Sequence, residues 1–84
     1  MAEEQVARRR TRQRLSVLLQ EIPRDQSLTL VLHYLHGYSI EEIAEIMGTL
    51  VNTVRGRLRS ARKKMKQKIL SDPALGDWIE GRIP

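Results

Sequence analysis

A run of basic side chains between Arg55 and Lys68 has the clearest chemistry in this 84-residue sequence. Eight arginines and lysines occur there, and no acidic residue interrupts them before Asp72. Like charges repel along one helix, so folding alone rarely favours such a concentration. Because arginine and lysine pair with phosphates, the run and the net charge of +5 favour nucleic acid as the partner. On charge alone, a solvated helix face explains the run equally well.

The spacing within this segment separates an apolar face from a polar one. On a helical wheel, Val54, Leu58 and Ala61 fall on the core side. The polar side chains opposite them could face a DNA groove, where arginine can hydrogen-bond guanine and asparagine adenine. We expect the cations on the flanks to meet the phosphates on the groove walls. The outward set is Asn52, Thr53, Gly56, Arg59, Ser60 and Lys63, and the flanking set is Arg55, Arg57, Arg62 and Lys64.

Gly56 lies in the middle of the outward set. A glycine inside a helix costs about 1 kcal/mol relative to alanine. Two interpretations remain open: the glycine permits close approach of the backbone to DNA, or it is a tolerated surface residue.

Two helices are predicted before this unit, and no strand pattern occurs. The first has an apolar stripe at Leu15, Leu18, Leu19 and Ile22, and Pro23 ends it. We expect Asp25 to cap the second helix and Gly37 to end it. Its predicted core stripe is Leu28, Val31, Leu32 and Leu35. Leu30 and Tyr34 form a ridge beside that stripe, either as more core or as a docking surface for a partner.

Two further helices complete a helix-turn-helix pattern. Ser39 and Glu42 form a capping box, so a short helix begins at Ile40 and ends at Gly48. Thr49 is the expected cap of the last helix. The short helix is predicted to bury Ile40, Ile43, Ala44 and Met47, and the long one Val51, Val54, Leu58, Ala61, Met65 and Ile69. We therefore predict an all-α, four-helix domain with a C-terminal helix-turn-helix.

The domain is expected to occupy residues 15–70. Residues 1–14, rich in arginine, are interpreted as a flexible arm, a linker remnant or a frayed first helix. Residues 71–84 are interpreted as a tail. In that tail Trp78 is expected either to pack back on the core or to dock on a partner. Without a long apolar run or an apolar leader, the chain is expected to be cytoplasmic and not in a membrane.

Residues 18–65 resemble region 4 of bacterial sigma factors, especially the extracytoplasmic-function group. The resemblance rests on the Ile-Pro turn at 22–23, Gly-Tyr-Ser-x-x-Glu-Ile-Ala at 37–44 and Thr-Val-Arg-x-Arg-Leu-x-x-Ala-Arg at 53–62. It implies a winged-helix-like domain without a wing that binds the minus-35 promoter element. It also implies contact with the flap of the RNA polymerase β subunit and coverage by an anti-sigma factor. The matched DNA-contacting positions are Asn52, Thr53, Arg55, Gly56, Arg59 and Ser60, and we expect Leu30, Tyr34 and Trp78 to contact protein partners.

The chain departs from the family pattern at three points. Leu50 replaces the usual serine or proline before the last helix, which weakens the cap or moves it to Thr49. Gly56 replaces a common serine. The chain has no room for region 2, which melts DNA, so alone it should not initiate transcription.

Other interpretations stay open at this point. The sequence fits either an excised domain or a short stand-alone regulator. It also fits a protein-interaction module that hardly touches DNA, in which Leu30 and Tyr34 would matter more than any arginine. A dimeric response-regulator type is disfavoured by the Ala-Arg-Lys-Lys continuation at 61–64.

Catalysis and metal binding have no support in the sequence. Cysteine is absent, which excludes a disulfide or a catalytic thiol. No nucleophile and base, phosphate loop or metal cluster can be assembled, so we expect no enzyme activity and no cofactor. His33 and His36 are close in sequence, but with no third ligand nearby two surface histidines are the favoured interpretation.

Overall fold

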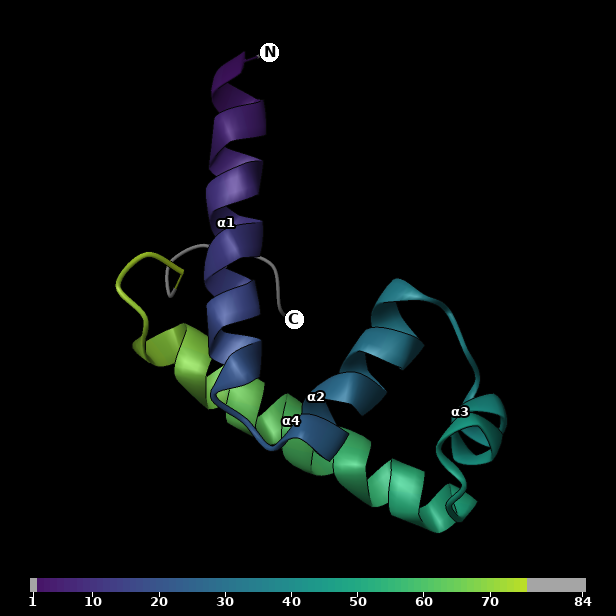
Figure 1. Cartoon of the computed structure of the whole chain (residues 1–84). Coiled ribbons are helices and arrows are strands. Elements are labelled where there is room, and N and C mark those ends of the chain that lie inside the picture. Colours follow the sequence, from purple (N-terminus) through teal and green to yellow (C-terminus); the bar gives the residue numbers. More distant parts are fainter. Residues whose placement is uncertain (1, 76–84) are drawn as a thin grey trace.

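A computed structural model describes residues 2–75 of the chain. These residues form α1 (Ala2–Gln20), α2 (Arg24–Leu30), a π-helical turn η1 (Val31–Leu35), α3 (Ile40–Met47) and α4 (Val51–Ser71). Within this part of the chain there is no strand, and the predicted all-α helix-turn-helix class is confirmed. In Figure 1, α4 crosses below α1 and α2, while α3 lies near the N-terminal end of α4.

The stretch interpreted as an arm is helical. α1 begins at Ala2, and Leu18 on its core side is buried as the stripe predicted. Its first residues, from Ala2 to Arg10, are exposed. Figure 1 shows this end of α1 projecting away from the other helices.

Helix α4 supplies side chains to two hydrophobic clusters, which makes it the central element of the fold. The α1 core consists of Leu18, Ile22, Ala61, Met65, Ile69 and Leu75. The α3 core consists of Ile43, Ala44, Val54 and Leu58. Leu30 of α2 packs against both cores and joins them. Because one face of α4 is buried along its whole length, the other face is fixed in orientation.

The predicted core stripe of the second helix was only partly right. Leu32 packs against the α3 core, but Leu28 is 42% exposed and Leu35 75% exposed, whereas Thr29 is fully buried. Thr29 can be buried because its hydroxyl donates a hydrogen bond to the Asp25 carbonyl oxygen at 2.6 Å, which satisfies the polar group. The π-helical turn then changes the register of the following residues.

The predicted start of α2 was wrong as well. The N-cap of α2 is Pro23, so Asp25 lies inside the first turn. There it accepts a hydrogen bond from the backbone N–H of Gln26 at 2.9 Å. This hydrogen bond uses Oδ1 of Asp25, and Oδ2 remains available to pair with a side chain of another helix.

The start of α3 and the turn before α4 follow the sequence closely. Ser39 and Glu42 form both hydrogen bonds of the capping box, each at 3.0 Å. α3 ends at Gly48, whose φ of 63° is left-handed, as a glycine there predicts. Thr49 is not the cap of α4, because Leu50 takes the N-cap position without any side-chain hydrogen bond. The departure at Leu50 therefore leaves this helix start without a side-chain cap.

The residues directly after α4 are part of the fold. Leu75 is only 2% exposed and packs in the α1 core. Asp72 is also buried, and Arg14 of α1 donates a hydrogen bond to it. The predicted tail was wrong for residues 72–75, while Trp78 lies outside the described residues.

Candidate nucleic-acid interface

The outward face of α4 is the candidate interface, and burial defines it. Val54, Leu58 and Ala61 are completely buried beneath it. Asn52, Gly56, Arg59 and Lys63 are exposed, while Thr53 and Ser60 are half-buried at its edge. The structure thus places the six outward residues together on the side of α4 that faces away from both cores.

On one flank of α4, two cations are paired with carboxylates from α2 and from the turn before it. Arg57 Nε lies 3.2 Å from Asp25 Oδ2 of α2, and Lys68 Nζ lies 3.2 Å from Glu21 Oε2. Lys64 is half-buried on the same flank. Of the predicted flanking residues, Arg57 is therefore already engaged by a carboxylate, which weakens its attraction for a phosphate.

The opposite flank carries Arg55 and Arg62, and Arg59 borders it. Together with Ile40, the first residue of α3, these three arginines line a hollow in the surface. Arg62 Nε donates a hydrogen bond to the Leu58 carbonyl oxygen at 3.4 Å. The Arg62 guanidinium lies 6.0 Å from the centroid of the Tyr34 ring, at the limit of a cation–π contact. This flank therefore concentrates guanidinium groups that have no ion-pair partner among residues 2–75, next to the start of α3.

The start of α3 is locked by its capping box. Hydrogen bonding by Ser39, chiefly from its backbone N–H, lowers the pKa of Glu42 below the ordinary value of 4.5. The carboxylate therefore stays ionised at neutral pH and interacts favourably with the positive N-terminal end of the helix dipole. The box holds Ile40 and hence one wall of the arginine hollow in place.

The two ridge residues predicted to contact protein partners lie in different environments. Leu30 is half-buried between the two cores, so it is mainly a packing residue. Tyr34 is 57% exposed, and its ring meets the His33 ring edge-on at 4.9 Å. Of this pair, Tyr34 is the accessible side chain.

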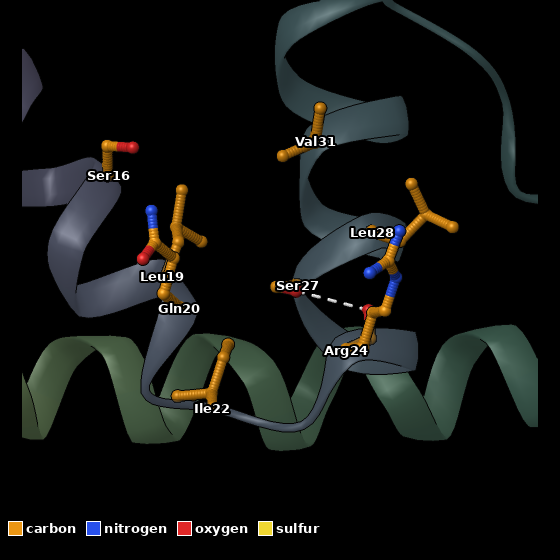
Figure 2. Close-up of a pocket in the computed structure, with 8 residues that line it drawn as sticks. All are labelled: Ser16, Leu19, Gln20, Ile22, Arg24, Ser27, Leu28 and Val31. Atoms are coloured by element: carbon orange, nitrogen blue, oxygen red, sulfur yellow. Dashed lines mark hydrogen bonds between the residues drawn. The ribbon is translucent and has the colours of Figure 1, made fainter.

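A second hollow lies between α1 and α2 (Figure 2). Its apolar lining comes from Leu19 and Ile22 on one side and Leu28 and Val31 on the other. In Figure 2, Ile22 lies at the base of this groove and Leu19 and Val31 lie on opposite sides of it. The polar residues around it are Ser16, Gln20, Arg24 and Ser27. The sequence pattern gave no sign of this surface, because Leu28 and Val31 were expected in the core.

No group of three metal-ligating side chains occurs within residues 2–75. His33 Nδ1 lies 2.8 Å from the carbonyl oxygen of Tyr38 and so contributes to the loop before α3. Among the helices that the structure describes, none is long and apolar enough to cross a membrane.

Comparison with known proteins gives matches along most of the described chain. A family model described as "Sigma-70, region 4" matches residues 12–65. The chain is 41% identical over 51 residues to the ECF RNA polymerase sigma-E factor of Haemophilus influenzae, covering 61% of this chain and 27% of that protein. It is 36% identical over 56 residues to the ECF RNA polymerase sigma factor EcfG of Rhodopseudomonas palustris, covering 67% of this chain and 31% of that protein. The chain thus spans less than a third of the length of either relative. No solved structure matches significantly.

Proposed function

The chain belongs to the sigma-70 region 4 family, and from this membership we propose that it binds double-stranded promoter DNA through the outward face of α4. Within that function, the element bound is the minus-35 promoter sequence. The domain acts as part of an extracytoplasmic-function sigma factor that recruits RNA polymerase in the cytoplasm. The arginine-rich start of α1 is then part of the linker from the preceding region.

The observation that carries this proposal is the contrast between the two faces of α4. One face supplies completely buried residues, and the other presents Asn52, Arg59 and Lys63 to solvent. A helix held this firmly by its inner face can place its outer side chains in a major groove without rearrangement. Arg59 and Asn52 are suited to guanine and adenine, and Ser60 and Thr53 to several bases or phosphates.

Selection from a pool of randomised DNA duplexes at two salt concentrations tests the proposal. We expect one enriched half-site motif and an affinity that falls steeply as salt rises. Arg59→Ala should relax the preference at one position of the motif, at a cost of about 1–3 kcal/mol for its best base. Lys64→Ala should instead weaken binding to all sequences about equally. Salt-dependent binding with no enriched motif would refute sequence recognition by the isolated domain.

The groove between α1 and α2 favours a second, compatible function. Its exposed apolar residue Leu28 and its half-buried residues Leu19 and Val31 suit an apolar helix of a protein partner. By the family resemblance, the partner is the flap of the RNA polymerase β subunit or an anti-sigma factor. Tyr34, in the π-helical turn η1 that follows α2, remains a candidate contact, and Trp78 remains a candidate outside the described residues.

A further inference from the structure

The cations on the two flanks of α4 differ in what surrounds them. On one flank, Arg57 and Lys68 are paired with Asp25 and Glu21. On the other flank, Arg55, Arg59 and Arg62 have no ion-pair partner among residues 2–75. Among residues 2–75, two cations on one flank are therefore paired with carboxylates, whereas the three arginines on the other flank are not.

These three arginines share one hollow with Ile40. Guanidinium groups that line one hollow repel one another, and an anion bound there relieves this repulsion. Each guanidinium presents several N–H donors in a plane, which fits an anion with several oxygen acceptors. The hollow is therefore chemically suited to a phosphate.

Two long contacts restrict the Arg62 side chain at this hollow. Its Nε donates to the Leu58 carbonyl oxygen, and the Tyr34 ring lies beside its guanidinium at 6.0 Å from the centroid. Tyr34 lies within the π-helical turn η1, a rare geometry that sets where its side chain projects. A side chain ordered before binding loses less conformational entropy when it binds.

We infer that Arg55, Arg59 and Arg62 form a seat for one phosphodiester of the DNA backbone, and that Tyr34 is a positioning residue for Arg62. This inference rests on the proposed function and deepens it, because it predicts that the domain holds chiefly one wall of the groove. DNA is favoured over an acidic protein because Arg59 belongs both to the hollow and to the outward face of α4. A duplex that contacts the outward face brings its own phosphates to that border. Arg55, which the helical wheel placed on a groove wall and the family resemblance placed among the DNA-contacting positions, is here assigned to the phosphate.

The test compares Arg62→Gln with Arg57→Gln, which remove the same charge from opposite flanks of α4. The probe is a random-sequence 20-bp duplex, and the readout is the slope of log K against log salt. Each phosphate neutralised contributes about 0.9 to this slope. Arg62→Gln should reduce the steepness by about that amount, whereas Arg57→Gln should leave it almost unchanged, because Asp25 already neutralises Arg57. Equal slopes for the two variants would overturn the seat.

Tyr34 is tested by its own pair of variants. Tyr34→Ala should weaken duplex binding and broaden or shift the Arg62 Nε–H resonance, while Tyr34→Phe, which keeps the ring, should restore both. Unchanged binding in Tyr34→Ala would overturn the positioning role.

Inorganic phosphate separates failure of the seat from failure of the proposed function. If the unmodified domain did not bind any duplex, the proposed function would fail. The seat would still predict that phosphate shifts the Nε–H resonances of Arg55 and Arg62 and not that of Arg57. A uniform response of all arginines, or none, would overturn it.

Discussion

Two glycines near the interface, Gly48 and Gly56, occupy positions with different backbone requirements. Gly48 has a φ of 63°, a backbone angle that residues with a side chain rarely adopt, while Gly56 lies inside α4. A Cβ added at either position meets nothing within 4 Å. Backbone conformation alone therefore decides how an added methyl group changes the stability of the fold.

Alanine substitution of the two glycines should have opposite effects on stability. Gly56→Ala should raise the free energy of unfolding by about 1 kcal/mol, because alanine is the better helix former. Gly48→Ala should lower it by about 1–2 kcal/mol, because the left-handed backbone is strained for any side chain. Urea denaturation of the two variants measures both changes.

Gly56→Ala also decides between the two interpretations of Gly56. A stabilised Gly56→Ala domain with undiminished DNA affinity would identify Gly56 as a tolerated surface residue. A loss of affinity without loss of stability would show that the backbone there approaches the duplex. A drop in stability of Gly56→Ala would contradict the account of this helix.

At the level of elements, α1 is joined to the segment after α4 by Arg14 and Asp72. The Arg14 hydrogen bond is the main cause that lowers the pKa of Asp72 below its ordinary value of 3.8. Ala74 N–H also donates to Asp72 Oδ1 at 2.8 Å, whereas burial acts in the opposite direction. This carboxylate therefore fixes the turn that brings Leu75 into the α1 core.

A lowered pKa in the folded state means that ionised Asp72 stabilises the fold. This contribution is complete above the unfolded-state pKa, near 3.8, and is lost as the pH falls through the lower folded-state pKa. Asp72→Asn should therefore lower the melting temperature at pH 7. The difference in melting temperature between this variant and the unmodified domain, here called the gap, should close at acidic pH. Glu21→Gln, at an exposed pair with Lys68, is the control and should change little. A gap that stays constant down to pH 2 would contradict this role of Asp72.

Which elements could be predicted depended on how local their determinants are. The capping box at Ser39, the left-handed Gly48 and the core stripe of α4 were predicted correctly because each rests on residues within a few turns. The buried face of α2 was not predicted, because burying Thr29 depends on a hydrogen bond to its own helix and a π-helical turn that no leucine pattern signals.

The features of the site that could not be predicted depend on contacts between residues distant in sequence. The wheel placed Arg57 and Arg62 on equivalent flanks, but Asp25 of α2 neutralises only Arg57. Likewise, Leu75 seemed to belong to a tail because its partners in the α1 core are distant in sequence. The outward set on α4 was predicted, whereas the difference between its flanks required the packing of α2 on α4.

On the scale of the whole molecule, one helix serves both the fold and the proposed function. α4 contributes Val54 and Leu58 to one core and Ala61, Met65 and Ile69 to the other. The groove between α1 and α2 lies on the other side of this core arrangement from the outward face of α4. The proposed DNA face and the proposed docking groove therefore do not overlap, and we expect that both can be occupied at the same time.

Mapping of backbone amide shifts by NMR during titration with the selected duplex tests the central claim most directly. The account predicts that the largest changes fall at residues 52–63 of α4 and at the start of α3, with little change along the α1–α2 groove. Changes concentrated at Leu19, Leu28 and Val31, with α4 unaffected, would contradict DNA binding by α4, because the duplex would then contact the groove between α1 and α2 instead.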